Sequence, residues 1–281
     1  MQKPLVSIIV PVYNTGRATK RLIDTVLKDK YSSYDIILVD DGSTDNSLEI
    51  LQSIKDKRVR VLHQKNSGAS AARNLGLKKI KGDYIIFLDS DDEIKPKFLA
   101  QLTGSILENP KNFPVTGMYR HRKGIKEYEN LYPKKLRPRD PGEPKKEYIL
   151  WLLIQDGRMY PVVNKIFDAK IIKQNHLQFD PNFTFAEDLK FVLDYLEYAS
   201  SDIKFIQEPL YIYHFDNDTS LTNSAALHWS NWQKSLNHLK KWAGKLSPKA
   251  TIYLALIYAR WRVSYTKAGR RDRAKRKANK A

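Results

Sequence analysis

Four acidic residues fall within positions 89–93, directly after the apolar run 85–88. Crowded carboxylates repel one another unless a cation lies among them. Clustered carboxylates are the usual ligands of hard divalent cations such as Mg²⁺ and Mn²⁺, and an incomplete set leaves coordination positions for substrate phosphates. The segment therefore predicts a site for a metal-bound diphosphate. The simpler alternative is that these acids favour the N-terminus of a helix beginning at Pro96, which explains Asp92 and Glu93 better than Asp89.

Other polar residues also follow apolar runs. Tyr13 and Asn14 follow a run that begins at position 5, and Asp40 and Asp41 follow the run 36–39. Ligands of parallel sheets bind beyond the carboxyl ends of the strands. If these runs are parallel strands, the polar residues meet the acidic cluster at one edge of the sheet.

The elements that must position these residues alternate along the first third of the chain. Apolar, β-branched runs predict strands, and apolar residues three or four apart predict helices. The predicted strands are 5–10, 36–39, 59–62 and 84–88, and the predicted helices are 17–28, 45–54, 69–80 and one from Pro96. Asp45 is expected to cap the second helix. The alternation predicts an α/β fold with a mostly parallel central sheet flanked by helices.

The rest of the chain is less regular. Residues 119–146 are rich in Lys, Arg and Pro, so we expect a long surface excursion there. We expect a helix from Glu187, short strands at 203–206 and 210–213, and helices within 224–268.

Composition sets further bounds. The 281 residues include no cysteine, which excludes disulfides and thiolate metal sites. Residues 260–281 hold ten Lys or Arg against the single acid Asp272, in a chain of formal net charge +18. Such a tail fits an anionic partner, or it is a solvated terminus. No run reaches the ~18 apolar residues of a spanning helix, and the N-terminus does not fit a signal peptide. We expect a protein that is soluble or lies on a membrane surface.

Four stretches, VSIIVPVYN, ILVDDGSTDNS, NSGASAARNLGL and GDYIIFLDSDD, together resemble family 2 glycosyltransferases of the GT-A fold. VVNKIFDAKII, FAEDLKFVL and PLYIYHFDNDTSLT extend this resemblance over residues 4–222. The family implies inverting transfer of a hexose or N-acetylhexosamine from a UDP-sugar, with Mn²⁺ or Mg²⁺, to a hydroxyl group of a surface-glycan or lipid-linked acceptor. It implies a nucleotide-binding half at 1–118, an acceptor-binding half at 119–222, and a helical, basic extension at 223–281.

The resemblance assigns one group of residues to the nucleoside of the donor. Pro11, Val12 and Tyr13 would line its site, with Tyr13 beside the base. Asp41, together with Asp40, would accept the uracil N–H.

A second group is assigned to the diphosphate. Gly68 and Arg73 lie on the stretch that passes the nucleotide, and Arg73 would pair with phosphate or with a site carboxylate. Asp89, Ser90 and Asp91 form the DxD motif. Asp91 is the expected direct metal ligand, and Asp89 a second ligand or a contact to the ribose or to water. The neighbouring residue 92 is expected to orient the motif.

An inverting displacement also needs a base for the acceptor proton, whereas a diphosphate leaving group needs no second acid. The resemblance assigns the base to Asp188 in the Glu187–Asp188 pair. Spacing alone leaves open a first-turn acid that only favours the helix dipole. Asn164 and Lys165 resemble a family pair that shapes the acceptor side, with a simple turn as the alternative. His214 lies near a point where related sequences often carry Arg. Its side chain would contact phosphate or metal, or would only pack against neighbouring side chains.

The C-terminal helices carry a separate pattern. Ile252, Leu256, Ala259 and Val263 share a helical face beside basic residues, as in helices that lie on anionic membranes. Packing on the core or in a homo-oligomer is the alternative. Because the resemblance implies acceptors that are linked to lipid, we expect a cytoplasmic protein, or one bound at the inner face of the cell membrane.

A nucleotidyltransferase and a nucleic-acid-binding protein are the two alternative functions. A nucleotidyltransferase would be expected to carry a Gly-rich, basic loop after the first strand, where this chain reads PVYNTGRATK. A nucleic-acid-binding protein is suggested by the charge, but no recognition motif supports it, so no nucleic acid is expected. Asp91 and Asp188 argue against a catalytically inactive relative.

Overall fold

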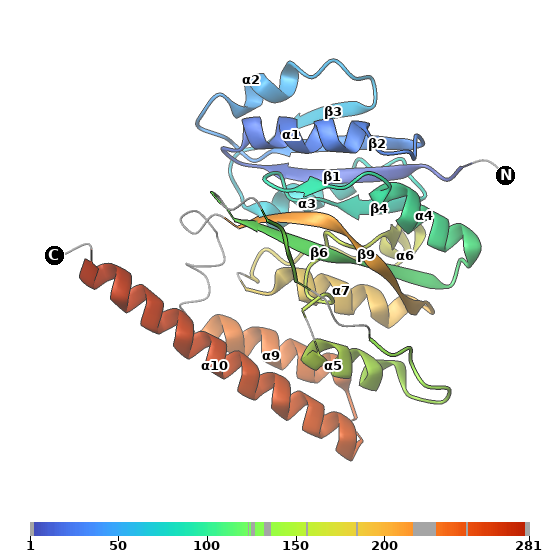
Figure 1. The fold of residues 1–281 in the computed structure, drawn as a ribbon, viewed down its shortest axis with the longest axis vertical. Helices are drawn as coiled ribbons and strands as arrows, with labels where there is room; N and C mark the ends of the chain where they lie inside the picture. The colour runs from blue at the N-terminus through green and yellow to red at the C-terminus, as the bar shows by residue number, and fades with distance from the viewer. Residues whose placement is uncertain are drawn as a thin grey trace.

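The computed structural model describes residues 3–122, 124, 127–131, 136–155, 157–183, 185–215, 229–245 and 247–278. This part of the chain forms two sheets with helices around them (Figure 1). The first sheet has the order β3-β2-β1-β4-β8 and the second has the order β5-β9-β6-β7. The strands are β1 (Val6–Val12), β2 (Tyr34–Asp40), β3 (Val59–His63), β4 (Tyr84–Phe87), β5 (Glu93–Ile94), β6 (Asn112–Arg122), β7 (Glu129–Asn130), β8 (Phe167–Asp168) and β9 (Asp202–Phe215).

The central strand of the first sheet is β1, and all seven of its residues are buried. A strand covered on both faces needs apolar residues throughout, which explains the unbroken run VSIIVPV. β1 pairs in parallel with β2 and β4, β2 pairs in parallel with β3, and β8 runs antiparallel to β4. The predicted, mostly parallel sheet is confirmed. Its carboxyl ends meet at one edge, where Val12 lies opposite Asp40 and Asp40 lies opposite His63.

Helices flank the sheets. Their bounds are α1 (Gly16–Leu27), α2 (Ser47–Gln52), α3 (Ala69–Leu77), α4 (Phe98–Glu108), α5 (Lys145–Gln155), α6 (Ala169–Gln174), α7 (Glu187–Tyr198), α9 (Trp229–Ala243) and α10 (Pro248–Ala278). The expected cap of α2 is wrong by one residue. Asn46 occupies the cap position, and Asp45 instead accepts a hydrogen bond from the Ser47 amide at 2.9 Å.

The second sheet corrects the prediction of a long surface excursion at 119–146. β6 continues to Arg122, β7 pairs with it, and α5 begins at Lys145, whereas residues 123, 125, 126 and 132–135 lie outside the described part. The two strands predicted at 203–206 and 210–213 are one strand, β9, which pairs in parallel with β6. The pairing register shifts around Gly117, opposite Pro209. Proline has no N–H to donate to a neighbouring strand, so Pro209 interrupts the strand pattern of the sequence. For this reason the single strand β9 was predicted as two strands.

The loop after β4 connects the two sheets, because β4 belongs to the first and β5 to the second. An aromatic cluster lies at the start of this loop. The ring of Phe87 packs edge-on against the rings of Phe167, Phe179 and Phe191 at centroid distances of 5.7, 5.1 and 5.5 Å. The acidic loop is therefore anchored on a packed core.

The helical region predicted within 224–268 is two helices, α9 and α10, of which α10 continues to Ala278. Residues 224–228 and the expected boundary at 222/223 lie outside the described part. Helices α5, α9 and α10 lie together as one layer, and α7 lies between that layer and the second sheet (Figure 1). Among the described residues, no helix combines the length and apolar character needed to cross a bilayer.

Candidate active site

The acidic loop after β4 is fixed from the second sheet. The Tyr211 hydroxyl on β9 donates to Asp92 Oδ2 at 2.5 Å and accepts from the Asp89 amide at 3.3 Å. The His214 amide donates to Asp92 Oδ1 at 2.8 Å. Burial raises the pKa of the Asp92 carboxyl well above its ordinary value, and the nearby Asp89 and Asp91 raise it further. Asp92 is therefore placed to orient the loop from the interior.

Asp89 and Asp91 are accessible in this loop. The Asp89 side chain is 34% exposed, and Asp91 is exposed. Ser90 between them is buried, with its hydroxyl 2.8 Å from the Thr15 hydroxyl, and Arg21 Nη2 donates to the Asp91 carbonyl at 3.1 Å. Within the described residues, no three His, Asp or Glu side chains gather into a complete metal site. Two accessible carboxylates on a braced loop therefore fit Mg²⁺ or Mn²⁺ only where water and ligand oxygens complete the coordination.

The predicted nucleoside residues lie at the end of β1. Asn14 adopts a positive φ of 53° and accepts a hydrogen bond from the Thr44 amide at 2.8 Å, which joins the ends of β1 and β2. Tyr13 is 45% exposed, whereas Pro11 and Val12 are buried. Of these three, Tyr13 has the side-chain surface to meet a base.

Asp41 connects the end of β2 to the loop after β3. Its Oδ1 accepts from Gln64 Nε2 at 2.7 Å and from the Ser67 amide at 2.9 Å, and its Oδ2 accepts from the Gly68 amide at 2.8 Å. Asp41 and Gly68 are thus brought together as predicted neighbours of the nucleotide. Their contacts show that the carboxylate also shapes this loop.

Asp40 is oriented differently from Asp41. Its side chain is fully buried, and its Oδ2 lies 2.7 Å from Nδ1 of His63. Its Oδ1 is buried without a hydrogen-bond partner among the described residues. The direct contact of Asp40 with uracil, expected from the sequence, stays a prediction.

Arg73 connects the DxD loop to the second acidic pair. The side chain is buried, and its guanidinium donates to Asp89 Oδ1 at 2.8 Å and lies 3.3 Å from Asp188 Oδ1. It also lies over the Phe179 ring, 5.2 Å from the centroid. Burial lowers the pKa of Arg73, but Asp188, Asp89 and Glu187 raise it by more, so the guanidinium stays charged. Of the two partners expected for Arg73, the carboxylate is the one that the structure shows.

Asp188 lies in the first turn of α7, after Ala186 in a left-handed conformation with φ 56°. The Val162 amide donates to Asp188 Oδ2 at 3.2 Å, and the side chain is 21% exposed. Burial raises the pKa of Asp188 to about 7, Arg73 lowers it, and Glu187 and Asp89 raise it. An acid that only favoured the helix dipole would need neither this burial nor the arginine. A carboxylate with a near-neutral pKa suits general-base chemistry.

Asn164 and Lys165 lie in the interior of the protein. Both are fully buried; Asn164 Nδ2 donates to the Thr116 carbonyl at 2.8 Å, and Lys165 Nζ donates to the carbonyls of Arg158 and Pro161 at 2.7 and 2.5 Å. The structure shows no surface of either side chain for an acceptor or phosphate, so the contact expected for this pair stays a prediction. The pair instead holds the loop that presents the Val162 amide to the predicted base.

His214 on β9 packs beside the acidic loop. Its Nε2 lies 2.8 Å from Glu93 Oε1, which also pairs with Arg21 Nε at 2.7 Å, and its Nδ1 lies 3.2 Å from His121 Nδ1. Burial lowers the pKa of the His214 imidazole, Arg21 lowers it further, and Glu93 raises it. The packing role is visible, and contact with phosphate or metal stays a prediction. His121 was missed because β6, which places it opposite His214, was not predicted.

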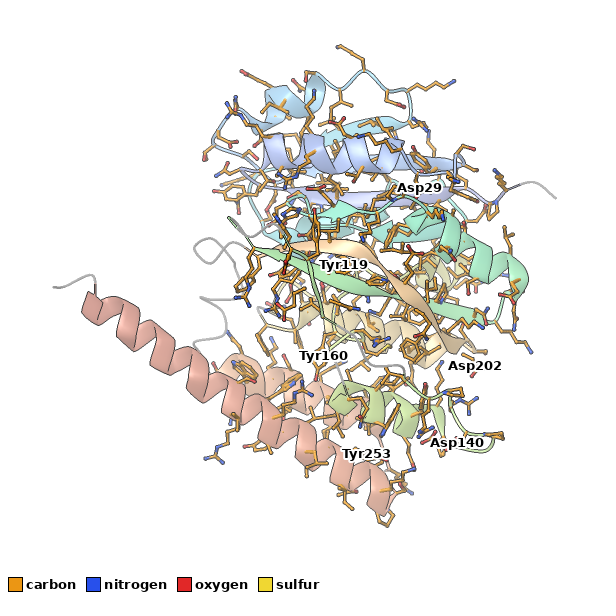
Figure 2. All side chains as sticks on the ribbon, viewed as in Figure 1. Asp29, Tyr119, Asp140, Tyr160, Asp202 and Tyr253 are labelled. Carbon is orange, nitrogen blue, oxygen red and sulfur yellow. The ribbon has the colours of Figure 1, made fainter. Side chains whose placement is uncertain are left out.

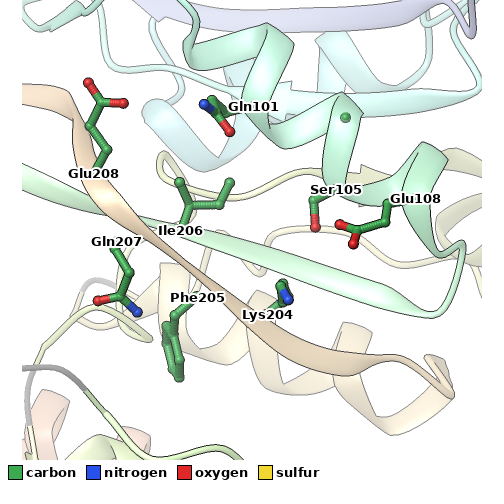
Figure 3. Close-up of a pocket in the computed structure, with 9 residues that line it drawn as sticks. Gln101, Ser105, Glu108, Lys204, Phe205, Ile206, Gln207 and Glu208 are labelled. Carbon is green, nitrogen blue, oxygen red and sulfur yellow. The ribbon is translucent and has the colours of Figure 1, made fainter.

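A pocket of about 380 Å³ lies elsewhere, between α4 and the first half of β9 (Figure 3). Gln101 and Glu108 line it from the helix and Lys204 from the strand. Tyr211 and His214 belong to the other end of β9. None of the predicted site residues lines this pocket, so the candidate active site is the edge where the parallel strands end.

This architecture, a central sheet flanked by helices with a helical C-terminal part, is that of the GT-A fold. The sequence model named "Glycosyl transferase family 2" matches residues 7–174, more than half of the chain. The chain belongs to glycosyltransferase family 2.

Curated relatives agree with this assignment. EpsJ of Bacillus subtilis (strain 168), described as an uncharacterized glycosyltransferase, is 34% identical over 221 residues, which cover 78% of this chain and 63% of EpsJ. The glycosyltransferase GlyG of Streptococcus pneumoniae serotype 4 is 30% identical over 243 residues, which cover 80% of this chain and 76% of GlyG. The chain thus spans somewhat less than two thirds of one of these relatives and about three quarters of the other.

Solved structures confirm the fold. Residues 1–349 of S. aureus TarS in complex with UDP superpose with a TM-score of 0.67 at 20% identity, covering 90% of this chain and 70% of that chain. The same TarS segment in complex with UDP-GlcNAc gives a TM-score of 0.65 at 20% identity, covering 90% and 71%. At this identity, the similarity shows the GT-A fold alone.

Proposed function

We propose that this chain is an inverting glycosyltransferase that moves a hexose or N-acetylhexosamine from a UDP-sugar to a hydroxyl group of a glycan acceptor. The observation that carries the proposal is the buried Arg73, which contacts Asp89 of the DxD loop and Asp188 of the acidic pair. One guanidinium thereby links the predicted donor motif to the predicted base. The complexes of TarS with UDP and UDP-GlcNAc support a UDP-sugar as the donor.

In the proposed reaction, the acceptor hydroxyl oxygen attacks the anomeric carbon while the bond from that carbon to the diphosphate oxygen breaks. Asp188 accepts the hydroxyl proton, and UDP leaves with the bonding electron pair. The pKa of Asp188, about 7, allows this carboxyl group to be ionised before the attack and to hold the proton afterwards. Tyr13 stacks beside the base of the nucleotide in this arrangement.

Asp91, with Asp89, is the set that would hold Mn²⁺ or Mg²⁺ together with diphosphate oxygens. Such a cation, when bound, stabilises the negative charge on the leaving diphosphate. Tyr211 and Asp92 keep the loop in one conformation from the interior, so the two carboxylates are presented without rearrangement.

The acceptor is proposed to be a precursor of a surface polysaccharide, lipooligosaccharide or teichoic acid, assembled in the cytoplasm at the inner face of the membrane. The outer face of α10 supports membrane docking. Ile252, Leu256 and Val263 are 59%, 49% and 53% exposed on one face of this helix. Arg260 and Arg262 are exposed beside them. An apolar face next to basic residues complements anionic phospholipid, which we propose as its partner.

Membrane docking is tested by sedimentation with vesicles of phosphatidylglycerol and of phosphatidylcholine. The expected result is binding to the anionic vesicles alone, weakened by salt and by Leu256→Asp. Binding that ignores lipid charge, or concentration-dependent dimerisation abolished by the same substitution, would contradict a lipid partner.

The catalytic proposal is tested by measuring UDP release from a panel of UDP-sugars, with and without Mn²⁺. Asp188→Asn and Asp91→Asn serve as matched isosteric variants. The expected result is metal-dependent release from at least one UDP-sugar that both variants lose. Release that survives Asp188→Asn unchanged would remove this residue from the role of base.

A further inference from the structure

Helices α9 and α10 lie beyond the part of the chain that the family model matches, which ends at residue 174. They contact the two segments that hold Asp188, which itself also lies beyond residue 174. One segment is the turn at 185–187 that opens α7. The other is the loop after residue 160, whose Val162 amide donates to the Asp188 carboxylate.

The turn before α7 is held mainly by α9. Ser235 Oγ donates to the Phe185 carbonyl at 2.7 Å. The Phe185 ring stacks on Trp232 with centroids 4.1 Å apart, and meets Trp261 of α10 edge-on at 5.8 Å. Ser235, Trp232 and Trp261 are each 5% exposed. The backbone of residue 185, three positions before the base, is therefore fixed by a buried cluster.

The loop after residue 160 is held by α10. Trp261 Nε1 donates to the Tyr160 hydroxyl at 3.0 Å, and the two rings pack with centroids 5.9 Å apart. Tyr160, labelled in Figure 2, lies two residues before Val162. Trp261 thus contacts both segments, since its ring also meets Phe185.

We propose that α9 and α10 complete the catalytic site, with Trp261, Trp232 and Ser235 as positioning residues that fix the Asp188 carboxylate relative to the acceptor. The inference rests on the proposed role of Asp188 as the base. Reactivity is sensitive to displacements of about 1 Å at a reacting group. Loosening either segment should therefore lower kcat while leaving the predicted donor residues Asp89 and Asp91 unchanged, since neither segment contains them.

The test compares Trp261→Phe and Tyr160→Phe, which both remove the hydrogen bond between these two side chains and both keep an aromatic ring. Tyr160→Phe also removes the 3.4 Å hydrogen bond that the Tyr160 hydroxyl donates to the Leu153 carbonyl. Trp242→Phe is the matched control. Trp242 is also a buried tryptophan of the C-terminal layer, 7% exposed, but its Nε1 has no hydrogen-bond partner among the described residues. Kinetics with the UDP-sugar found active, UDP affinity and thermal unfolding are measured for every variant.

The expected result is a fall in kcat of about tenfold for Trp261→Phe and for Tyr160→Phe, with UDP affinity retained. The fall in the double variant should be clearly smaller than the product of the two single falls, because both substitutions remove the Trp261–Tyr160 hydrogen bond. Trp242→Phe should keep the wild-type kcat. Equal kcat in Trp261→Phe and Trp242→Phe, or a loss that follows thermal stability across all variants, would overturn the inference. Failure of the proposed function is separate, since wild-type turnover would then be absent or insensitive to Asp188→Asn.

Discussion

The near-neutral pKa of Asp188 predicts how turnover depends on pH. Burial in the first turn of α7 raises this pKa to about 7, even though Arg73 lies 3.3 Å away and acts against the rise. A general base works only when deprotonated, so kcat should fall as pH falls through this value. With a midpoint at about 7, the deprotonated fraction, and therefore kcat, should rise about tenfold from pH ~6 to pH ~8.

The assay is UDP release at saturating donor and acceptor, followed across this pH range. Asp188→Asn keeps the shape of the side chain and removes the base, so kcat should fall by about 10²–10⁴-fold and the pH dependence through this midpoint should disappear. UDP affinity should stay close to that of the wild type, since Asp188 does not belong to the predicted nucleotide contacts. A kcat that stays flat across this range, as a midpoint near the ordinary Asp value of 3.8 would produce, would show that the arginine outweighs burial and would contradict the assignment.

Three further substitutions test the supports of the site. Arg73→Leu removes the buried cation that two carboxylates share, so the free energy of unfolding, measured in urea, should fall by about 3–5 kcal/mol; an unchanged value would contradict the bridging role. Tyr211→Phe removes the hydroxyl that donates to the buried Asp92, and should cost about 1–3 kcal/mol while weakening metal-dependent UDP binding; wild-type stability and binding would argue against this anchor. Gly42 directly follows Asp41 and has a φ of +70°, and Gly42→Ala would place a Cβ 2.6 Å from the Asn66 backbone nitrogen. Calorimetry should therefore show weaker UDP binding for this variant. Gly104→Ala, at a position where the Cβ would meet no atom within 4 Å, should bind UDP as the wild type does.

Much of the first sheet could be predicted from the sequence because its strands are buried on both faces. Unbroken apolar runs such as 6–12 leave little choice of element, and the polar residues that interrupt them mark the carboxyl ends. Asp41 and Asp89 were therefore placed at the correct edge. The family resemblance added the role of Asp188, which spacing alone left undecided.

The second sheet was not predictable in the same way. β6 and β9 are neighbours in space but about 90 residues apart in the sequence. Their pairing places His121 against His214 and brings the Tyr211 hydroxyl to Asp92. No local pattern in 119–146 indicates such contacts, because they depend on a register between distant strands.

The burial of Asn164 and Lys165 illustrates the same limit. Their sequence resembles a motif of the acceptor side, but their burial depends on contacts with Thr116 of β6 and with the carbonyls of Arg158 and Pro161. The contacts that α9 and α10 make with the rest of the chain could not be predicted from the sequence either. Trp232 and Trp261 were predicted as helical residues, and their contacts with Phe185 follow from packing between distant elements.

The most direct test of the account is calorimetric titration of UDP into the protein with Mn²⁺, with EDTA, and with the Asp91→Asn variant. UDP is expected to bind in the presence of the metal, and chelation or loss of the Asp91 carboxylate should weaken binding by about tenfold or more. UDP binding of equal strength in EDTA, or no binding under any of these conditions, would contradict the assignment of the acidic loop to a metal-bound diphosphate.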